Sequence, residues 1–319
     1  MTVRSPGGYE QLNRHTRVIV DEALARGVAV EIVDPALGEL CLQWGGRKVT
    51  TLESLSELTS AVAFRRCDDK IHTRRVLQAA GLPVAAGQVA TFGPADTDFL
   101  DRHQDLVVKP ARGEQGRGIT VGVTTIDALA RARDVARQHW PEVLLEKRCR
   151  GEDLRVIVID QEVVAAAVRR PPTVTGTGSR TLADLIREFS AARVAATGAN
   201  STVPLDDVTR DTLRTAGFAG LEDIPPPGEV VMVRKTANVH TGGTISDVTD
   251  ELHPELQKLA VAAAAAVDLP VAGIDLIVDA VGAPNGVIIE VNEQPGLANH
   301  EPRPTAARFL DLLFPETRR

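Results

Sequence analysis

Aromatic residues, cysteines and long apolar runs are all scarce in this sequence. Aromatic residues make up only 3% of the chain, so the core must rest mainly on Ala, Val, Leu and Ile. The longest apolar run, LAVAAAAAV, stops at Asp268 and is too short to span a bilayer. The opening residues, MTVRSPGGYEQ, lack the apolar segment of a secretory signal. We therefore expect a cytoplasmic protein.

The three cysteines, Cys41, Cys67 and Cys149, lie far apart and form no CxxC pair. This excludes a zinc site built from paired cysteines and fits a reducing compartment. The formal net charge is -7, and no block of like charge is long enough to suggest a nucleic acid or a membrane as partner. Small molecules are the expected partners. The sequence indicates no oligomeric state, and a homodimer is the default expectation.

The chain has the balance of a globular protein, with 43% hydrophobic and 25% charged residues, and its length suits two or three lobes. The pattern predicts an α+β protein. We expect a helix from Leu12 to Arg26, two short strands, and helical stretches over 52–64 and 65–83. The rest is rich in strands, with further helices predicted at 126–138, 181–196, 254–267 and over the closing PTAARFLDLLF. Residues 172–229 are interpreted as an insertion around one polar helix.

The segment GVIIEVNEQPG, 286–296, ends an apolar strand with a carboxylate and an amide. Side chains alternate along a strand, so Glu290 and Asn292 share one face while Ile289 and Val291 point into the core. A hairpin turn near Gly282 would place Asp275 opposite Glu290. Three converging oxygen donors suit magnesium. The alternative is a set of solvated polar positions on a half-exposed hairpin.

A glycine-rich loop follows Lys109 in VVKPARGEQGRGITVGV. Its glycines, Gly113, Gly116 and Gly118, fit neither the dinucleotide-binding spacing nor the P-loop, and the loop joins a strand to a strand rather than to a helix. Such a loop is able to cover an anion with its backbone N–H groups, and Lys109 adds positive charge. The alternative is an ordinary flexible hairpin with a solvated lysine.

Charged residues also gather in VLLEKRCRGEDLRVIV. Glu146 and Lys147 end one strand and Asp153 begins the next. At such a turn these residues are able to contact an adenine edge and ribose hydroxyls. The alternative is a charged, solvated turn. A second hairpin, turning near Gln161, would place Asp153 opposite Arg169 with Arg155 on the same face. Two guanidinium groups suit a carboxylate or a phosphoryl group. A cross-strand ion pair is the alternative for Arg169.

In order along the chain, these residues, together with Lys70 and Lys235, resemble the ATP-grasp superfamily from about Asp69 to the end. The resemblance implies two α+β lobes that clasp ATP, after a short N-terminal α/β lobe. The implied boundaries are 1–64 for the N-terminal lobe, 65–147 for the small lobe, and 148–319 for the C-terminal lobe with its insertion. The implied cofactors are ATP and Mg²⁺, with Mn²⁺ as a substitute.

The resemblance also implies a role for each residue. Lys70, Lys109 and the glycines of the loop match phosphate-binding positions, Glu146 and Lys147 the adenine hinge, Asp153 the ribose acid, and Lys235 the residue at the terminal phosphate. Asp275, Glu290 and Asn292 match the magnesium ligands. Arg155, Arg169 and Asn238 match positions at the acyl group, with His240 and 241–243 beside them. The backbone of Gly296, with His300, would meet the carboxylate end of the substrate.

Two longer stretches, RKTANVHTGGTISDVTDELHPE and EVNEQPG, are similar to the cyanophycin synthetase branch. Two others, SLSELTSAVAFRRCDDK and PGLANHEPRPTAARFLDLLFP, resemble the ATP-grasp portion of the N-acetylglutaminylglutamine synthetase family. The resemblance implies an ADP-forming carboxylate–amine ligase that joins amino acids through an acylphosphate. The loop 111–118 and part of 172–229 would exclude water as a lid.

The chain lacks the acetyltransferase-like region of that family. The resemblance therefore implies either a separate acetyltransferase as partner or substrates that are not acetylated. Two alternative functions stay open at this point. One is a kinase-like phosphotransferase on the same fold, and the other is a nucleotide-binding regulatory module without catalysis.

Overall fold

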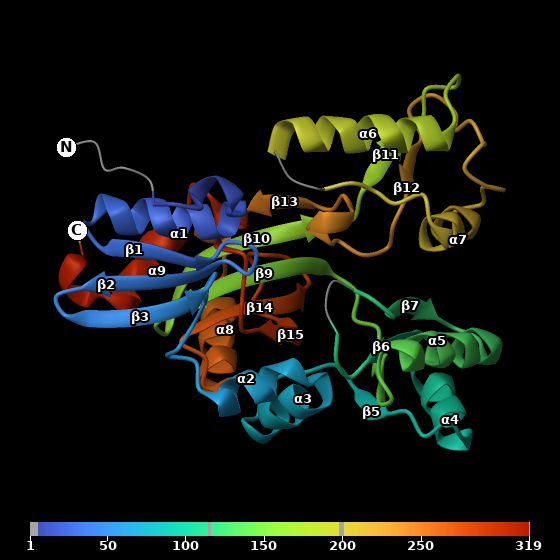
Figure 1. Ribbon diagram of the computed structural model, residues 1–319. Coiled ribbons are helices and arrows are strands. Elements are labelled where there is room, and N and C mark those ends of the chain that lie inside the picture. The colour runs from blue at the N-terminus through green and yellow to red at the C-terminus, as the bar shows by residue number, and fades with distance from the viewer. Residues whose placement is uncertain (1–5, 114–115, 198–200, 319) are drawn as a thin grey trace. The chain divides into compact units, whose positions relative to one another are not determined.

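The structure is a computed structural model that describes residues 6–113, 116–197 and 201–318 (Figure 1). The chain forms two compact units, each built from separate segments. The first unit comprises Met1–Thr91, Leu144–Ala167 and Asp247–Arg319, and the second comprises Phe92–Val143 and Val168–Ser246. Mixed helices and antiparallel strands confirm the α+β class. The three consecutive lobes with boundaries at 64 and 147 stay a prediction.

The first unit begins with a helix and a four-stranded antiparallel sheet in the order β1-β2-β3-β4. These elements are α1 (Arg14–Ala25), β1 (Ala29–Asp34), β2 (Glu39–Trp44), β3 (Arg47–Leu52) and β4 (Leu55–Ser56). The side chain of Asn13 caps α1 by accepting from the backbone N of Thr16 at 3.0 Å. The predicted first helix and first two strands are confirmed.

The helix expected over 52–64 is wrong in its first half. The end of β3 and the short strand β4 occupy that segment, because Glu53 adopts a positive φ of 51° and turns the chain between them. Helix α2 (Ala61–Asp68) starts only after Ser60, whose side chain accepts from the backbone N of Ala63. Helix α3 (Lys70–Ala79) follows at once.

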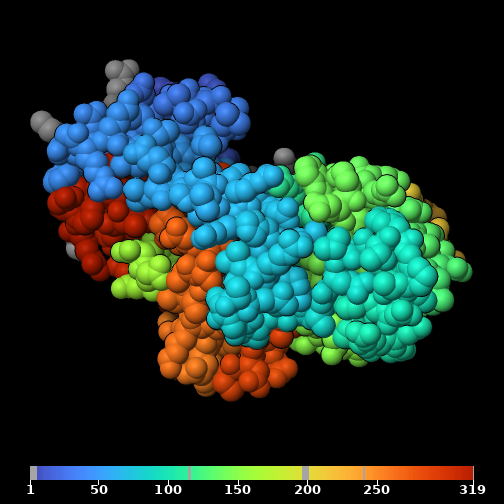
Figure 2. Space-filling view, turned by 90° about the horizontal axis from the view of Figure 1, so that it is seen from below, coloured from blue at the N-terminus to red at the C-terminus, as the bar shows by residue number. Residues whose placement is uncertain are grey.

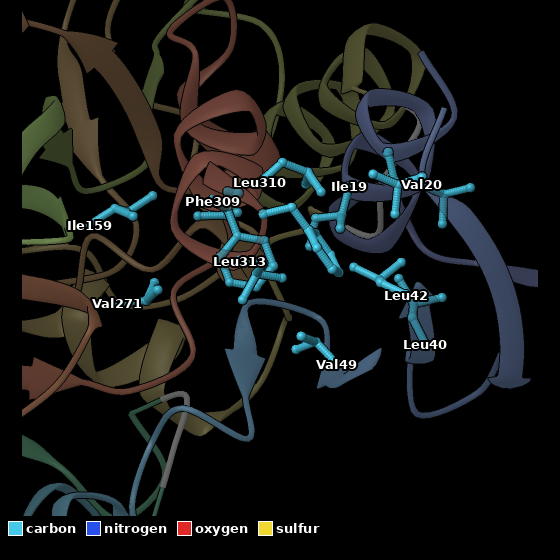
Figure 3. Packing of buried hydrophobic residues seen from close by; sticks show 14 of the residues in the cluster. Ile19, Val20, Leu40, Leu42, Val49, Ile159, Val271, Phe309, Leu310 and Leu313 are labelled. Atoms are coloured by element: carbon cyan, nitrogen blue, oxygen red, sulfur yellow. The ribbon is translucent and has the colours of Figure 1, made fainter. Parts of the chain in front are cut away.

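The core of the first unit joins the beginning of the chain to its end. Ile19 of α1, Leu40 and Leu42 of β2 and Phe309 of α9 (Thr305–Leu313) are all fully buried in one cluster (Figure 3). The closing helix therefore packs back on the body through its apolar face, as its amphipathic pattern predicts.

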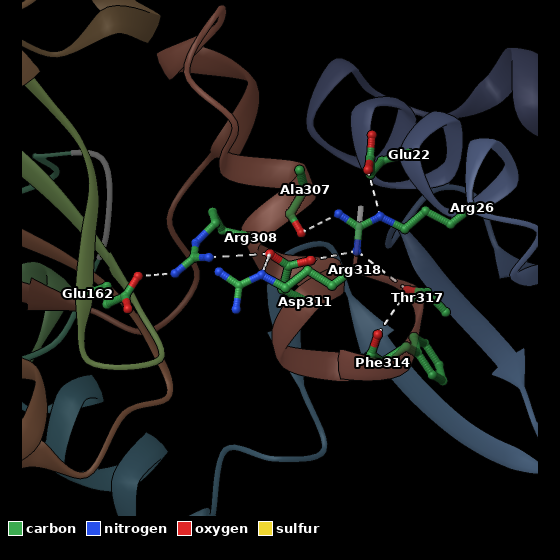
Figure 4. Close-up of polar contacts among 9 residues, drawn as sticks. All are labelled: Glu22, Arg26, Glu162, Ala307, Arg308, Asp311, Phe314, Thr317 and Arg318. Atoms are coloured by element: carbon green, nitrogen blue, oxygen red, sulfur yellow. Dashed lines mark hydrogen bonds and ion pairs between the residues drawn. The ribbon is translucent and has the colours of Figure 1, made fainter.

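A buried arginine strengthens this junction (Figure 4). The Arg26 side chain is 3% exposed and donates to Asp311 at 2.7 Å and to the carbonyl of Ala307 at 2.9 Å. Glu22, one turn earlier on α1, accepts from Arg26 Nε at 2.6 Å. Arg26 is almost fully buried, so its charge depends on these two carboxylates for compensation.

The central sheet of the first unit contains the strands with most of the predicted site residues. These strands are β9 (Glu152–Ile159), β10 (Glu162–Arg170), β14 (Val271–Val278) and β15 (Gly286–Asn292), in the order β10-β9-β14-β15. Asp160 and Gln161 have positive φ values of 50° and 62°, so the turn between β9 and β10 lies where the sequence predicts it. Helix α8 (Pro254–Val267) packs on β14 and β15.

Helices α2 and α3, sky blue in Figure 2, lie beside the orange α8. A short strand, β5 (Gly87–Val89), follows α3 and pairs antiparallel with β8 (Val143–Lys147). The short 3-10 turns of the chain are η1 (Tyr9–Gln11), η2 (Val239–Thr241), η3 (Thr249–Glu251), η4 (Leu297–His300) and η5 (Pro315–Thr317). No helix within 6–113, 116–197 or 201–318 is long and apolar enough to cross a membrane.

The second unit contains the glycine-rich loop and the insertion. Its elements are α4 (Pro94–His103), β6 (Leu106–Pro110), β7 (Thr120–Val123), α5 (Ile126–His139), β11 (Thr173–Thr175), α6 (Leu182–Thr197), α7 (Asp207–Thr215), β12 (Val230–Met232) and most of β13 (Thr244–Asp247). The expectation of one helix in 172–229 is wrong, because α7 is a second one. Strands β11 and β12 pair antiparallel and share a core with both helices through Ile186 and Leu213.

Candidate functional site

Two neighbouring strands, β14 and β15, carry the three oxygen-bearing side chains that the sequence indicates as metal ligands. The strands pair antiparallel, with Asp275 opposite Glu290 and Gly273 opposite Asn292. This is the register predicted for a hairpin. Asn292 Nδ2 lies 3.2 Å from the carbonyl O of Gly273 and 3.5 Å from Asp275 Oδ2. The fold therefore brings the three side chains together.

A β-bulge interrupts this pairing at the site. Asp275 pairs with Glu290 but the next residue, Leu276, pairs with Ile288, so Ile289 is the extra residue. Ile288 and Val291 are each 2% exposed, whereas Ile289 is only half-buried. The prediction that Ile289 points into the core is therefore wrong. Bulges redirect side chains near functional sites, and this one shifts the alternation immediately before Glu290.

Arg155 lies on β9 directly opposite Asp275 and forms a two-pronged ion pair with it. Its Nε donates to Asp275 Oδ1, and its Nη2 donates to Oδ2 at 3.0 Å. Gly273 provides the space, because a Cβ there would lie 2.8 Å from Arg155 Nη1. Asp275 is 4% exposed, so the guanidinium compensates a buried carboxylate.

Lys70 pairs with the other carboxylate of the site. Asp69 caps α3 by accepting from the backbone N of Ile71 and of His72, which makes Lys70 the first residue of the helix. Lys70 Nζ lies 3.0 Å from Glu290 Oε1. Each of the two acidic side chains predicted to bind metal therefore has a basic partner in this structure.

A second ion pair lies one helical turn further along α3. Arg74 Nη1 donates to Glu146 Oε1 at 3.0 Å, and both side chains are nearly buried. Both ion pairs of α3 border one pocket. Its lining residues are Cys67, Lys70, Thr73, Arg74, Leu77, Val84, Glu146 and Ile288 to Val291. The predicted hinge residue Glu146 and the predicted ligand Glu290 thus face the same space.

Cys67 lies in this pocket as a buried thiol. Its Sγ donates to the carbonyl of Val291 at 2.7 Å, and the side chain is 6% exposed. Burial, followed by the nearby carboxylate of Glu293, raises the pKa of the thiol. The thiol is therefore protonated and unreactive at neutral pH, which fits a packing role.

The donor chemistry of this group fits a hard divalent cation. Two carboxylates and one amide oxygen are ligands that Mg²⁺ accepts, usually alongside substrate phosphates. Within the described residues, no three His, Cys, Asp or Glu side chains are grouped so as to hold a metal ion. The group on β14 and β15 has only two such side chains, and its third donor is the amide of Asn292. Both oxygens of Asp275 accept from Arg155, so a cation that takes Asp275 as a ligand competes with that guanidinium for the carboxylate.

The residues predicted at an adenine and a ribose lie on β8 and β9, on either side of the turn that joins them. Lys147 donates its backbone N to the carbonyl of Ala86 at 2.7 Å. Gly151 has a φ of 148°, and a Cβ there would lie 2.3 Å from the carbonyl O of Val278. The turn therefore passes tightly against the end of β14. Asp153 pairs with Ile277 across β9 and β14. The nucleotide roles of Glu146, Lys147 and Asp153 stay predictions.

The glycine-rich loop joins two antiparallel strands, as predicted. Val108 pairs with Thr120 across β6 and β7, and Lys109 at the end of β6 is 4% exposed. Gly113, Gly116 and Gly118 all have positive φ values, of 126°, 75° and 72°. Other side chains would be strained there, so the loop depends on glycine. Residues 114–115 of the predicted lid lie outside the described residues, as do 198–200 of the insertion.

Besides the three glycines of the loop, four predicted site residues belong to the second unit, namely Lys109, Arg169, Lys235 and Asn238. Strand β12 ends at Met232, so Lys235 lies in the segment that follows it. Asn238 shapes the loop that follows, since its carbonyl accepts from the backbone N of Gly243 at 2.8 Å. The side chain of His240 lies outside the described residues. That these four side chains join the group around Asp275 stays a prediction.

The N-terminal segment contacts the turn that follows Asn292, which the sequence does not indicate. Ser54 is 1% exposed and donates its hydroxyl to the carbonyl of Pro295 at 2.7 Å. A Cβ on Gly296 would lie 2.6 Å from the imidazole of His15. His300 is buried, at 6% exposure. Roles for Gly296 and His300 at a substrate carboxylate stay predictions.

Arg74 and Gly87 are the other members of the site that the sequence pattern misses. Arg74 had a usable signal, since it stands four residues after Lys70 and so shares its helix face. Gly87 had none, because its importance depends on a strand pairing with a distant segment.

Comparisons with known proteins agree with this geometry. Residues 233–305 match the family described as the RimK-like ATP-grasp domain. Over 323 residues the chain is 33% identical to cyanophycin synthetase of Trichormus variabilis, covering 95% of this chain and 35% of that protein. It is 27% identical over 326 residues to a glutathione biosynthesis bifunctional protein of Clostridium perfringens, with 96% of this chain and 42% of that protein covered.

Solved structures give the same result. The crystal structure of a bifunctional glutathione synthetase from Pasteurella multocida is 25% identical, with a TM-score of 0.66, covering 97% of this chain and 44% of that one. The chain thus spans less than half the length of these relatives. Together with the antiparallel ligand strands, these similarities establish that the chain has the ATP-grasp fold and belongs to the ATP-grasp superfamily.

Proposed function

We propose that this protein is an ATP-dependent, ADP-forming ligase that joins the carboxylate of one amino acid to the amine of another. The observation that carries the proposal is the group formed by Asp275, Glu290 and Asn292 on paired strands, with Arg155 and Lys70 beside the two carboxylates. Acidic ligands and basic side chains in contact suit the joint binding of a cation and phosphates. The names of the relatives, synthetases for cyanophycin and glutathione, support amide-bond formation.

Mg²⁺, held by Asp275, Glu290 and Asn292, would neutralise negative charge on the phosphates of ATP. The remaining work falls to the side chains of the chain itself. Lys70 and Lys109 bind phosphate oxygens, and Lys235 meets the terminal phosphate. Glu146, Lys147 and Asp153 bind the adenosine. Catalysis rests on positioning and electrostatic stabilisation, as in other phosphoryl transfers.

The reaction proceeds in two steps. The carboxylate oxygen of the first substrate attacks the terminal phosphorus of ATP, which forms an acylphosphate and releases ADP. The amine of the second substrate then attacks the acyl carbon, and phosphate leaves. Arg155 and Arg169 bind the acyl group, and Asn238 lines its site. The glycine loop and part of 172–229 exclude water, because water would hydrolyse the acylphosphate.

Amino acids or short peptides are the proposed substrates. The specific candidate is the synthesis of N-acetylglutaminylglutamine from a substrate that another protein has acetylated. If the substrate is not acetylated, the candidate product is the same dipeptide without its acetyl group. ADP release measured over single amino acids and pairs, with mass spectrometry of the products, tests this function. We expect ADP release that requires Mg²⁺ and both amino acids, with an amide product. A phosphorylated product without an amide would indicate a phosphotransferase instead, and nucleotide binding without turnover would indicate a regulatory module.

A further inference from the structure

Helix α3 carries two basic side chains on one face, and each pairs with a carboxylate from a different strand. Lys70 Nζ lies 3.0 Å from Glu290 Oε1 of β15, and Arg74 Nη1 lies 3.0 Å from Glu146 Oε1 of β8. Lys70 and Arg74 are four residues apart, so they are neighbours on the helix surface. One helix therefore contacts both the predicted metal end and the predicted adenine end of the nucleotide site.

The pair between Arg74 and Glu146 is deeply buried. Their side chains are 10% and 8% exposed, whereas Glu290 of the other pair is 33% exposed. A buried ion pair is seldom the most stable way to fill an interior, because two apolar side chains of similar volume avoid the cost of desolvation. Stability alone is therefore a weak explanation for a charged pair at this position.

Gly87 on the neighbouring strand provides space for this pair. Gly87 pairs with Glu146 across β5 and β8, and a Cβ at residue 87 would lie 3.0 Å from Glu146 Cγ and 3.1 Å from Arg74 Cζ. Gly87 is not among the described residues with a positive φ, so its backbone conformation does not demand glycine. The missing side chain is what matters, since it lets strand, carboxylate and guanidinium pack together.

Part of the wall of the pocket beside the pair is apolar. Apolar side chains stand next to the two ion pairs, from Leu77, Val84 and Ile288. Binding sites for small molecules combine such apolar walls with a few polar groups that determine orientation. Glu146, Glu290 and Lys70 are charged groups in the lining of this pocket.

We propose that Arg74 is a positioning residue for recognition of the nucleotide base. Its guanidinium holds the Glu146 carboxylate in one orientation, in which the carboxylate accepts a hydrogen bond from the exocyclic amino group of a 6-aminopurine. A carboxylate has about four lone-pair sites, and the contact with Arg74 Nη1 uses one of them. A 6-oxopurine presents an oxygen at the same place and is repelled. This inference rests on the proposed function, because it assumes that Glu146 faces adenine.

Calorimetric titration of the full chain with ADP and with IDP, in the presence of Mg²⁺, tests the proposal through the ratio of the two dissociation constants. We expect the wild type to prefer ADP by about tenfold or more, the size of one hydrogen bond to a charged group. Arg74→Ala should lose most of this preference, and Arg74→Lys should keep part of it. Gly87→Ala keeps both charges but crowds the pair and the carbonyl O of Leu145, 2.9 Å from the added Cβ, so it should also reduce the preference.

Arg75→Ala is the matched control, since Arg75 is the next residue of α3 and is exposed. It should leave the ratio unchanged. A merely structural role for Arg74 would weaken the binding of both nucleotides equally, and an unchanged ratio in Arg74→Ala would therefore overturn the inference. If Arg74→Ala does not fold, Arg74→Lys and Gly87→Ala decide in the same way.

The two proposals fail in different ways. If the wild type binds neither ADP nor IDP, the proposed function is wrong and the inference fails with it. If the wild type binds both nucleotides equally well, the inference is wrong while the proposed function stands.

Discussion

Arg155 donates two hydrogen bonds to the carboxylate of Asp275 from the neighbouring strand, and this contact joins two residues predicted to have different roles. The sequence assigns Arg155 to the acyl group and Asp275 to the metal. In this structure the arginine compensates the buried carboxylate itself. Both assignments hold together if the guanidinium leaves Asp275 when a cation arrives and turns to a phosphate or acyl oxygen.

Replacement of Arg155 should therefore make the protein more dependent on metal for stability. Arg155→Ala removes the guanidinium that compensates the buried carboxylate of Asp275, which we expect to cost about 3–5 kcal/mol of unfolding free energy in the absence of Mg²⁺. Millimolar Mg²⁺ should recover part of that loss, because a ligand that binds only the folded state stabilises it. Urea unfolding with Mg²⁺ and with a chelator measures both effects.

Arg210→Ala is a suitable control for this experiment, since Arg210 forms an exposed pair with Asp207 on α7. It should change stability by well under 1 kcal/mol. An Arg155→Ala protein as stable as the wild type without metal would show that Asp275 does not need its partner.

Loss of Glu290 should abolish Mg²⁺-dependent ADP release while the fold remains. The Glu290 side chain is one-third exposed and pairs with Lys70, so Glu290→Ala removes a proposed ligand without opening the core. Circular dichroism monitors the fold and a coupled ADP assay monitors turnover. Glu255→Ala, on the exposed face of α8, removes a carboxylate elsewhere and should have no effect. Full turnover by Glu290→Ala would reject the metal assignment.

Lys109 offers a test within the second unit. Its side chain is buried at the end of β6, immediately before the glycine-rich loop. Lys109→Met keeps the apolar stem and removes the charge, so we expect nucleotide affinity to fall by about tenfold or more, as for other hydrogen bonds to charged groups. Calorimetry with a non-hydrolysable ATP analogue measures it, and an unchanged affinity would remove Lys109 from the phosphate site.

Ser54 tests whether the N-terminal segment supports the turn after the ligand strand. Ser54→Ala leaves the buried carbonyl of Pro295 without this donor, which should cost about 1–3 kcal/mol of unfolding free energy. If the turn also contacts substrate, KM for the amino acids should rise more than KM for ATP. Ser179→Ala, an exposed serine in the second unit, is the control. An equal rise of both KM values would speak against a role of this turn at the substrate.

Arg303 should make stability sensitive to acid. Its guanidinium donates to Asp247 and Asp250, and these hydrogen bonds lower the pKa of both carboxyl groups. A carboxylate with a lowered pKa in the folded state contributes stability above its unfolded pKa of about 4, and loses that contribution as the pH falls through the folded value. Arg303→Ala should therefore lose less stability than the wild type between neutral pH and about pH 3. Urea unfolding across that range measures the free energy of unfolding of both proteins. If the ion pairs contribute nothing, the two free energies change in parallel with pH.

Much of the strand framework was predictable because alternating β-branched residues mark strands directly. The pairing of Asp275 with Glu290 followed from the hairpin geometry alone, since the turn and the two strands are consecutive in sequence. The closing helix was predictable for a similar local reason, its amphipathic pattern. Features that depend on one continuous segment of the chain were therefore predicted correctly from the sequence.

Features that depend on distant segments, or on an irregularity within a strand, were not. The bulge at Ile289 cannot be read from a regular alternation of side chains. The pair between Arg155 and Asp275 requires β9 to lie beside β14, although the two residues are 120 positions apart. The role of Gly87 likewise depends on its pairing with β8. Helix α7 was missed because its many Thr and Asp residues have weak helix propensity, and it is stabilised by packing on the core of the insertion.

A crystal structure with ADP, Mg²⁺ and an amino acid substrate tests the central claim most directly. We expect a metal ion within about 2.0–2.1 Å of oxygens from Asp275, Glu290 and Asn292 and of the nucleotide phosphates, with Arg155 moved away from Asp275. Bound nucleotide with Arg155 still on Asp275, Lys70 still on Glu290 and no metal between them would contradict the account.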